Sequence, residues 1–344
     1  MTRRVAWVDM AKGLGMLLII LAHAPLAEKL SRYIYSFHVP LFFLLSGYLY
    51  RDVGNATLLQ FLKNKFGKLG IPYLWFALIN FIILYIFQAL SDEATLSIPK
   101  SFVGTFLGLR SLNWSPHLGP LWFIPCLFLT ELVIFLISRN SSLHSKKTAV
   151  IVFIISVLGI IYNKTIHIPL AYSLDAVPFA LVFFYGGCLF AKFEHRFWEY
   201  LDTPVAFVGL GILSLALGIF NKTVNIFWSM YGNPAIYFIA AFLGIYLVIY
   251  VARSLPEVRF LEYIGKNAIV FLALHQIFLF GIFSAVVQRA GLPQDGNIER
   301  TLTGIVYTVS AVGLLIPINE LIKHYMPFLL GTRYLPRPIT QVNR

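Results

Sequence analysis

Long apolar runs recur from one end of this 344-residue sequence to the other, and they constrain its fold more than any other feature. A helix that crosses a bilayer needs about 20 consecutive apolar residues. Hydrophobic residues make up 58% of the chain and charged residues only 12%, a balance that a water-soluble surface does not permit. The sequence therefore predicts an all-α, polytopic integral membrane bundle of about 10 transmembrane helices, near residues 5–25, 37–50, 69–90, 118–138, 148–163, 170–191, 203–221, 233–252, 267–288 and 302–322.

The polar composition indicates how this bundle lies in the membrane. Lys and Arg are roughly twice as frequent on the side that holds both termini, and the positive-inside rule then places the termini in the cytoplasm. The net charge of +12 comes from residues scattered between apolar runs, without the block or stripe that binds nucleic acid. Cys126 and Cys188 lie in apolar runs, so neither a disulfide framework nor a metal site is predicted. We expect a lipid bilayer and no nucleic acid among the partners.

The connections between the runs are too short to hold a separate folded domain, the longest on the outer side being about residues 91–117. We therefore expect one transmembrane domain over residues 1–344, with no extramembrane domain and with any chemistry inside the bundle. The segment at about 51–68 mixes apolar and basic residues, as a short amphipathic helix on the inner surface does. Its central basic residues are Lys63, Lys65 and Lys68.

The first run carries polar residues that a purely structural membrane helix does not need. An ionisable group in hydrocarbon costs a few kcal/mol or more, so each one within a span is a candidate for function. Lys12 and His23 are eleven positions apart, about 1100° of helix, so they share one face about 16 Å apart. One helix can thus present a cation and an imidazole to one cavity. The simpler roles are an ion pair of Lys12 with Asp9 and a hydrogen-bonded interior position for His23.

Further polar residues lie near the ends of other runs. If the first helix enters the membrane near Val5, His23 lies about 27 Å along it, close to the outer boundary. His38, Trp122 and Asp175 stand at or near the outer starts of their helices in the same topology. Trp122 also suits an aromatic belt at the membrane interface, and Asp175 suits a helix cap.

Residues deeper in other runs have structural or functional roles open to them. His275, after Lys266, is expected mid-membrane, either as a packed interior residue or as a polar link to the site. Glu131 is predicted to hydrogen-bond to a neighbouring helix. The glycines predicted to permit close helix packing are Gly13, Gly47, Gly186 and Gly187.

Six segments, in order along the chain, resemble the membrane acyltransferase family 3. They are DMAKGLGMLLIILAH from Asp9 to His23, FHVPLFFLLSGY from Phe37, IPYLWF from Ile71, PLWFIPCLF from Pro120, DAVPFALVFFYGG from Asp175 and IGKNAIVFLALH ending at His275. The likeness is greatest to the branch described as fucose 4-O-acetylase and related acetyltransferases. Its most specific element is a Lys or Arg, ten residues and then a His, matched by Lys12 and His23. Many members carry Arg at the first position, and Lys12 lacks the guanidinium fork that binds phosphate through two N–H groups, so the details of donor contact differ from the family pattern.

The resemblance implies an enzyme of the bacterial cytoplasmic (inner) membrane. Such an O-acetyltransferase takes an acyl group, usually acetyl, from cytosolic acetyl-CoA and delivers it to a hydroxyl of a cell-surface polysaccharide or lipid-linked sugar. Acetyl-CoA is then the acyl donor, a carbohydrate is the acceptor, and no metal is expected.

Acyl transfer to an alcohol gives the polar residues definite roles. A sugar hydroxyl needs a base in the transition state, and His23 suits that role, with an acyl-histidine intermediate as the alternative. Positive charge or N–H groups are needed around the developing oxyanion, and His38, the indole of Trp122 and Lys266 are the candidates, among which the sequence does not choose. The predicted catalytic residues are His23, Lys12, Asp9 and His38; those for donor binding are Lys12, Lys63, Lys65 and Lys68; and those for substrate or oxyanion contact are Trp122, Asp175, Lys266 and His275.

Two functions other than acyl transfer also suit a helical bundle with embedded charges. A glycan transporter or flippase needs such charges along a substrate path, but the sequence has no recognisable paired half-repeats with broken helices. A scaffolding subunit has no reason to embed Asp9, Lys12 and His23 in a membrane. Acyl transfer is therefore the predicted function.

Overall fold

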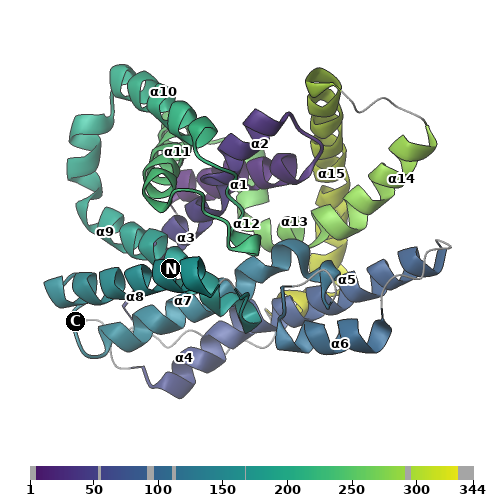
Figure 1. Ribbon diagram of the computed structural model, residues 1–344, viewed down its shortest axis with the longest axis horizontal. Coiled ribbons are helices and arrows are strands. Elements are labelled where there is room, and N and C mark those ends of the chain that lie inside the picture. The colour runs from purple at the N-terminus through teal and green to yellow at the C-terminus, as the bar shows by residue number, and fades with distance from the viewer. Residues whose placement is uncertain are drawn as a thin grey trace.

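The computed structural model describes residues 5–52, 56–90, 97–110, 114–166, 168–290 and 296–331 (Figure 1). These residues form a helical bundle, and the β interaction among them is an isolated bridge between Asn225 and Met230. The α-helices are α1 (Ala6–His23), α2 (Glu28–Tyr35), α3 (His38–Tyr48), α4 (Leu58–Lys65), α5 (Ile71–Leu90), α6 (Ile98–Leu107), α7 (Phe123–Ser138), α8 (Lys146–Thr165), α9 (Val177–Leu201), α10 (Pro204–Phe220), α11 (Pro234–Ser254), α12 (Arg259–Lys266), α13 (Ala268–Leu274), α14 (Gly281–Arg289) and α15 (Asn297–Tyr325). The predicted all-α fold is confirmed.

Eight helical stretches in the described part of the chain are long and apolar enough to cross a bilayer. They are Ala6–His23, Leu58–Ala89, Leu118–Ser138, Lys146–Thr165, Ala171–Leu201, Pro234–Ser254, Ala268–Val287 and Asn297–Tyr325. Each corresponds to one of the predicted apolar runs, so a polytopic membrane bundle is confirmed.

Two of the predicted runs form shorter helices. The run at 203–221 forms α10, an apolar helix of 17 residues. The run at 37–50 forms α3, whose 11 residues extend about 16 Å, roughly half of the hydrocarbon thickness of a bilayer. The hydropathy of this run predicts burial, but it does not distinguish burial in lipid from burial against protein. Helix α3 is buried mainly against other helices, so it does not need the length that crosses a bilayer.

The basic segment predicted at 51–68 is largely helical and continues into the next span. The side chain of Thr57 caps the first turn of α4. A π-helical turn, Phe66–Gly70, joins α4 to α5, so Leu58–Ala89 is one long helical stretch. Residues 53–55 of the predicted segment lie outside the described part of the chain.

Reciprocal glycine contacts bring α3 and α9 close together. A Cβ atom on Gly47 of α3 would lie 1.8 Å from the carbonyl oxygen of Phe184 in α9, and one on Gly187 of α9 would lie 2.0 Å from that of Leu44 in α3. A hydrogen atom is therefore the largest side chain that either position accepts. The predicted packing role of these two glycines is confirmed, whereas Gly186 faces the flexible ring of Phe242.

Reciprocal glycine contacts of the same kind join α1 to α12. A Cβ atom on Gly13 of α1 would lie 2.1 Å from the carbonyl oxygen of Leu261, and one on Gly265 of α12 would lie 1.9 Å from that of Asp9. The packing role predicted for Gly13 is thus confirmed. Because of this close contact, the C-terminal end of α12 is fixed beside the first half of α1.

Replacing Gly47 by alanine is expected to destabilise the protein, because the added methyl group overlaps the Phe184 carbonyl. Overpacking of this kind typically costs about 1–3 kcal/mol. Gly209→Ala is the matched control, since a Cβ atom on this α10 glycine meets nothing within 4 Å. Thermal unfolding of the purified protein in detergent should show a lower midpoint for Gly47→Ala and an unchanged or higher midpoint for Gly209→Ala. Equal midpoints would contradict the packing argument.

Candidate active site

A cavity of about 390 Å³ lies along α1. From α1 it is lined by Lys12, Met16, Ile19 and His23, at the spacing of one helix face. The structure therefore presents the predicted cation and imidazole to the same cavity. The remaining walls come from α3, α7 with the turn before it, α13 with the turn after it, the ends of α2 and α12, the π-helical turn before α5 and the segment between α10 and α11.

Three histidines from separate helices meet at one end of this cavity. The ring centroid of His23 lies 5.1 Å from that of His275 and 6.2 Å from that of His38. Tyr35, at the end of α2, completes the group, with its ring centroid 4.8 Å from that of His38. His23, His38 and Tyr35 line the cavity, whereas His275 is fully buried against His23.

The backbone fixes the tautomer of each histidine in this cluster. Every Nδ1 lies 2.8 Å from the carbonyl oxygen four positions earlier, which belongs to Ile19, Ile34 and Phe271 in turn. A carbonyl oxygen only accepts hydrogen bonds, so each Nδ1 carries the proton of the neutral ring and each Nε2 presents a lone pair. Within the described residues, Nε2 of His38 and Nε2 of His275 are buried and have no hydrogen-bond partner. The cluster is therefore chemically a set of proton acceptors.

The cluster corrects the predicted difference in depth between two histidines. The sequence placed His23 near the outer boundary and His275 mid-membrane, but rings 5.1 Å apart lie at one depth. Counting residues assumes that each helix stands upright from one surface, whereas membrane helices tilt. In addition, the helix that carries His275 changes to a π-helical turn, His275–Phe280, at that residue.

Two lysines line the cavity away from the histidines, Lys12 from α1 and Lys266 from the end of α12. Lys12 lies about 16 Å along α1 from His23. Nζ of Lys266 forms ion pairs with Glu262 and, at 3.9 Å, with Oδ2 of Asp9. Asp9 thus links α1 to α12 and holds Lys266 at the same end of the cavity as Lys12. We call this the lysine end, and the opposite end, with His23, His38 and His275, the histidine end.

The three lysines of the basic helical segment do not line the cavity in the part of the chain described. Nζ of Lys65 lies 2.7 Å from Oε2 of Glu131 in α7, so Glu131 joins its helix to a neighbouring one through an ion pair, where the sequence predicts a hydrogen bond. Leu69, which follows Lys68, does line the cavity. The segment with Lys63, Lys65 and Lys68 therefore ends at the cavity wall without entering it.

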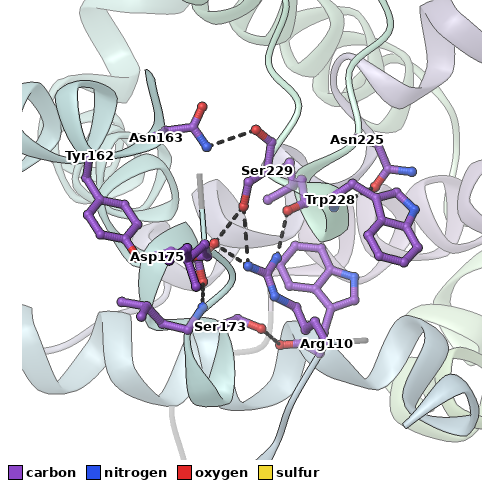
Figure 2. A network of polar contacts seen from close by, with 12 residues as sticks. Arg110, Tyr162, Asn163, Ser173, Asp175, Asn225, Trp228 and Ser229 are labelled. Atoms are coloured by element: carbon purple, nitrogen blue, oxygen red, sulfur yellow. Dashed lines mark hydrogen bonds and ion pairs between the residues drawn. The ribbon is translucent and has the colours of Figure 1, made fainter. Parts of the chain in front are cut away.

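A buried ion pair lies outside the cavity wall, between Arg110 and Asp175 (Figure 2). The two side chains are 1% and 2% exposed. The Asp175 carboxylate also accepts hydrogen bonds from Oγ of Ser229 at 2.6 Å and from the backbone N–H of Leu170 at 2.9 Å. The first residue before α9 is Ala176, which offers no side-chain cap, so the predicted helix-cap role of Asp175 is wrong. Asp175 holds neighbouring segments together instead of facing the cavity.

Several cavity residues were not predicted, most of them because they lie in connections between the predicted runs. Trp122 was predicted and lines the cavity, but so do Tyr35, Asn225, Trp228 and Gln276. Neither spacing nor hydropathy distinguishes Tyr35, Asn225 and Trp228 from ordinary loop residues, whereas Gln276 lies within the predicted run 267–288, directly after His275. Arg110 is a cation directly after an apolar stretch, which is a sequence signal for a buried charge. Because Arg110 falls in the predicted connection 91–117, its burial was not predicted.

A backbone feature shapes the wall next to Trp122. Gly119 has φ +29°, and a Cβ atom there would lie 3.1 Å from Oε1 of Gln276. A residue with a side chain is strained in this conformation, so glycine allows the chain to turn into α7 beside the cavity.

A protein-family model described as an acyltransferase domain, that of acyltransferase family 3, matches residues 5–320. This range contains every residue that lines the cavity. Searches of curated proteins and of solved structures found no match. Since the family model covers most of the sequence, this multi-pass membrane protein belongs to acyltransferase family 3.

Proposed function

We propose that this protein is an O-acetyltransferase that moves an acetyl group from cytosolic acetyl-CoA to a hydroxyl of a polysaccharide or lipid-linked sugar. The observation that carries the proposal is one cavity with lysines at one end and imidazoles at the other. Membership of an acyltransferase family supports acyl transfer over glycan transport.

The lysine end suits the anionic part of the donor. Lys12 contributes a positive charge inside the bundle, and Lys63 and Lys68 add charge on the helical segment that ends at the cavity wall, where Lys65 is paired with Glu131. The distance along α1 from Lys12 to His23 is about 16 Å, which an extended pantetheine arm can cover. The thioester of the donor would then lie at the histidine end while its phosphates remain near the lysines.

His23 is the proposed general base, because it is the least buried of the three histidines and lines the cavity with its Nδ1 already bonded to Ile19. Its Nε2 removes the proton of the acceptor hydroxyl as the hydroxyl oxygen attacks the thioester carbonyl carbon. The new C–O bond forms and the C–S bond breaks. The departing thiolate then takes the proton from the His23 imidazolium, so that coenzyme A leaves as a thiol.

The oxyanion of this reaction needs a donor at the histidine end. Nε2 of neutral His38 holds a lone pair, because Nδ1 is bonded to Ile34, so His38 is poorly suited to stabilise the oxyanion. Lys266 lies at the lysine end and is paired with Glu262. Among the cavity residues, the indole N–H of Trp122 and the hydroxyl of Tyr35 are the better candidates. Burial raises the pKa of Tyr35, which keeps this hydroxyl protonated and able to donate.

The proposal requires a particular orientation in the membrane. The lysine end faces the cytosol, both termini are cytoplasmic, and the chain acts as one transmembrane domain in a bacterial inner membrane. The excess of Lys and Arg on the side of the termini supports this orientation.

His23→Ala should lower kcat by about 10²- to 10⁴-fold, the usual contribution of a general base. The KM for acetyl-CoA should change little, because the donor phosphates lie at the other end of the cavity. Transfer of radiolabelled acetyl groups by the protein in lipid nanodiscs measures both constants. His144→Ala is the matched control, since His144 does not line the cavity. Full turnover by His23→Ala would contradict the proposed role of His23 as the general base. Labelled enzyme that is trapped in the absence of acceptor would indicate the acyl-histidine route instead.

Lys12→Ala should raise the KM for acetyl-CoA by about tenfold or more, as expected for loss of a charge-assisted contact of about 1.5–3 kcal/mol. The KM for S-acetylpantetheine, which lacks the nucleotide phosphates, should not change. Lys12→Arg should retain donor binding because its charge persists. An equal rise in KM for both donors would show that Lys12 does not contact the phosphates.

A further inference from the structure

The segment between α10 and α11, residues Asn221–Asn233, forms one wall of the cavity. Four consecutive residues of this segment, Asn225, Ile226, Phe227 and Trp228, line the cavity. The last three form a single 3-10 turn. Two aromatic rings and an amide are therefore presented to the cavity from a segment that contains no part of the predicted catalytic set.

The 221–233 segment is held in one conformation by its own backbone. Asn225 and Met230 exchange two backbone hydrogen bonds of 2.7 and 2.9 Å. Oδ1 of Asn225 accepts from the backbone N–H of Trp228 at 3.3 Å. Oδ1 of Asn221 accepts from the backbone N–H of Asn233 at 2.9 Å, which closes the base of the segment. The segment is thus a preformed wall.

Three polar contacts anchor this wall to the rest of the bundle (Figure 2). Nη1 of Arg110 donates to the carbonyl oxygen of Ile226 at 2.8 Å, and Oγ of Ser229 donates to Asp175 at 2.6 Å. Nδ2 of Asn163 donates to the carbonyl oxygen of Ser229 at 2.9 Å. The Arg110–Asp175 ion pair is therefore placed where it fixes the backbone on both sides of Trp228. A buried charge left without its partner is costly, so the pair and the wall form as one unit.

The aromatic and amide side chains that the wall presents to the cavity are suited to bind a sugar ring. Trp228 is 37% exposed, and Trp122 adds a second indole to the cavity lining. The negative face of an aromatic ring attracts the positive C–H groups of an apolar sugar face. The Nδ2 group of Asn225 makes no hydrogen bond to the residues that the structure describes, and the Gln276 amide also lines the cavity. These amides are suited to the hydroxyl edge of a sugar.

We propose that Asn225, Phe227 and Trp228 form the acceptor subsite, which binds one pyranose ring by stacking and amide hydrogen bonds. Arg110, Asp175 and Ser229 are positioning residues, which act through the backbone of the wall. This inference rests on the proposed acyl transfer and names the part of the cavity that selects the acceptor.

Trp228→Ala should lower the ratio of acetyl transfer to methyl pyranosides over transfer to glycerol by about tenfold, the upper range for loss of one aromatic contact. Glycerol offers hydroxyl groups without a ring face, so the ratio reports ring recognition. The full-length protein in nanodiscs is assayed with radiolabelled acetyl-CoA and each acceptor. Trp228→Phe should retain most of the ratio, and Met230→Ala, on the same segment but outside the cavity lining, should retain all of it. An unchanged ratio in Trp228→Ala overturns the subsite.

A binding measurement separates this inference from the proposed function. Methyl pyranosides are titrated calorimetrically into the protein without acetyl-CoA. Saturable binding by the wild type that is lost in Trp228→Ala supports the subsite even if no acetyl transfer occurs, in which case the proposed function alone fails. Binding that is equal in both proteins, or undetectable in both, overturns the subsite even if acetyl transfer proceeds.

Ser229→Ala tests the positioning role, because it removes the 2.6 Å hydrogen bond to Asp175 and the 3.4 Å one that Arg110 donates to Oγ of Ser229, while leaving the ion pair in place. The KM for methyl pyranosides should rise by about three- to tenfold, mainly from loss of the short buried hydrogen bond to Asp175, while the KM for acetyl-CoA stays constant. Ser214→Ala is the control, since it removes a 3.3 Å hydrogen bond to Tyr33 outside the wall. An equal rise in both KM values would show a general loss of structure instead of a specific positioning effect.

Discussion

Hydrocarbon offers no hydrogen-bond partner to a polar side chain, and this constraint determines how α1 is placed. Lys12 and His23 share one face of α1 and line the 390 Å³ cavity. The opposite face, with Leu14, Leu17 and Leu21, lines a separate, almost wholly apolar groove of about 670 Å³ between α1, α11 and α15. Helix α1 is thus a partition with one polar and one apolar surface. Its reciprocal glycine contacts with α12 keep the polar surface turned toward the cavity.

The histidine end shows how a helical backbone can orient imidazoles without carboxylates. In many catalytic sites an acidic side chain orients the imidazole, whereas here a carbonyl oxygen four residues earlier holds Nδ1 of His23, His38 and His275. A neutral carbonyl adds no charge to the membrane interior, so it avoids the desolvation cost of a buried carboxylate. The consequence is three imidazoles with a common tautomer, of which His23 is the most accessible from the cavity.

The Arg110–Asp175 pair shows the opposite arrangement, in which buried polar groups are satisfied by charged side chains instead of neutral carbonyls. Both groups are charged and buried, which is costly unless each finds several partners. Their partners are Ser229 and the backbone of Ile226 and Leu170, which lie in or beside short 3-10 turns of the connections instead of in α-helices. An ion pair of this kind specifies one arrangement of connections that apolar packing alone would leave loosely defined. It converts the 221–233 segment from a simple connection into a fixed wall of the cavity.

The sequence by itself determined the class of the fold, because bilayer thickness sets the length of the apolar runs. It also determined that Lys12 and His23 share a face, because helical periodicity fixes that relation within one helix. It also identified Gly13, Gly47 and Gly187 as packing positions and indicated His38, Trp122 and His275 as site candidates. Only the tertiary structure decided that His275 meets His23 and that Asp175 turns away from the cavity. It alone brought Tyr35, Asn225, Trp228 and Gln276 to the cavity. These relations join segments that are distant in the chain, and periodicity carries no information about which helices become neighbours or where a connecting segment folds back.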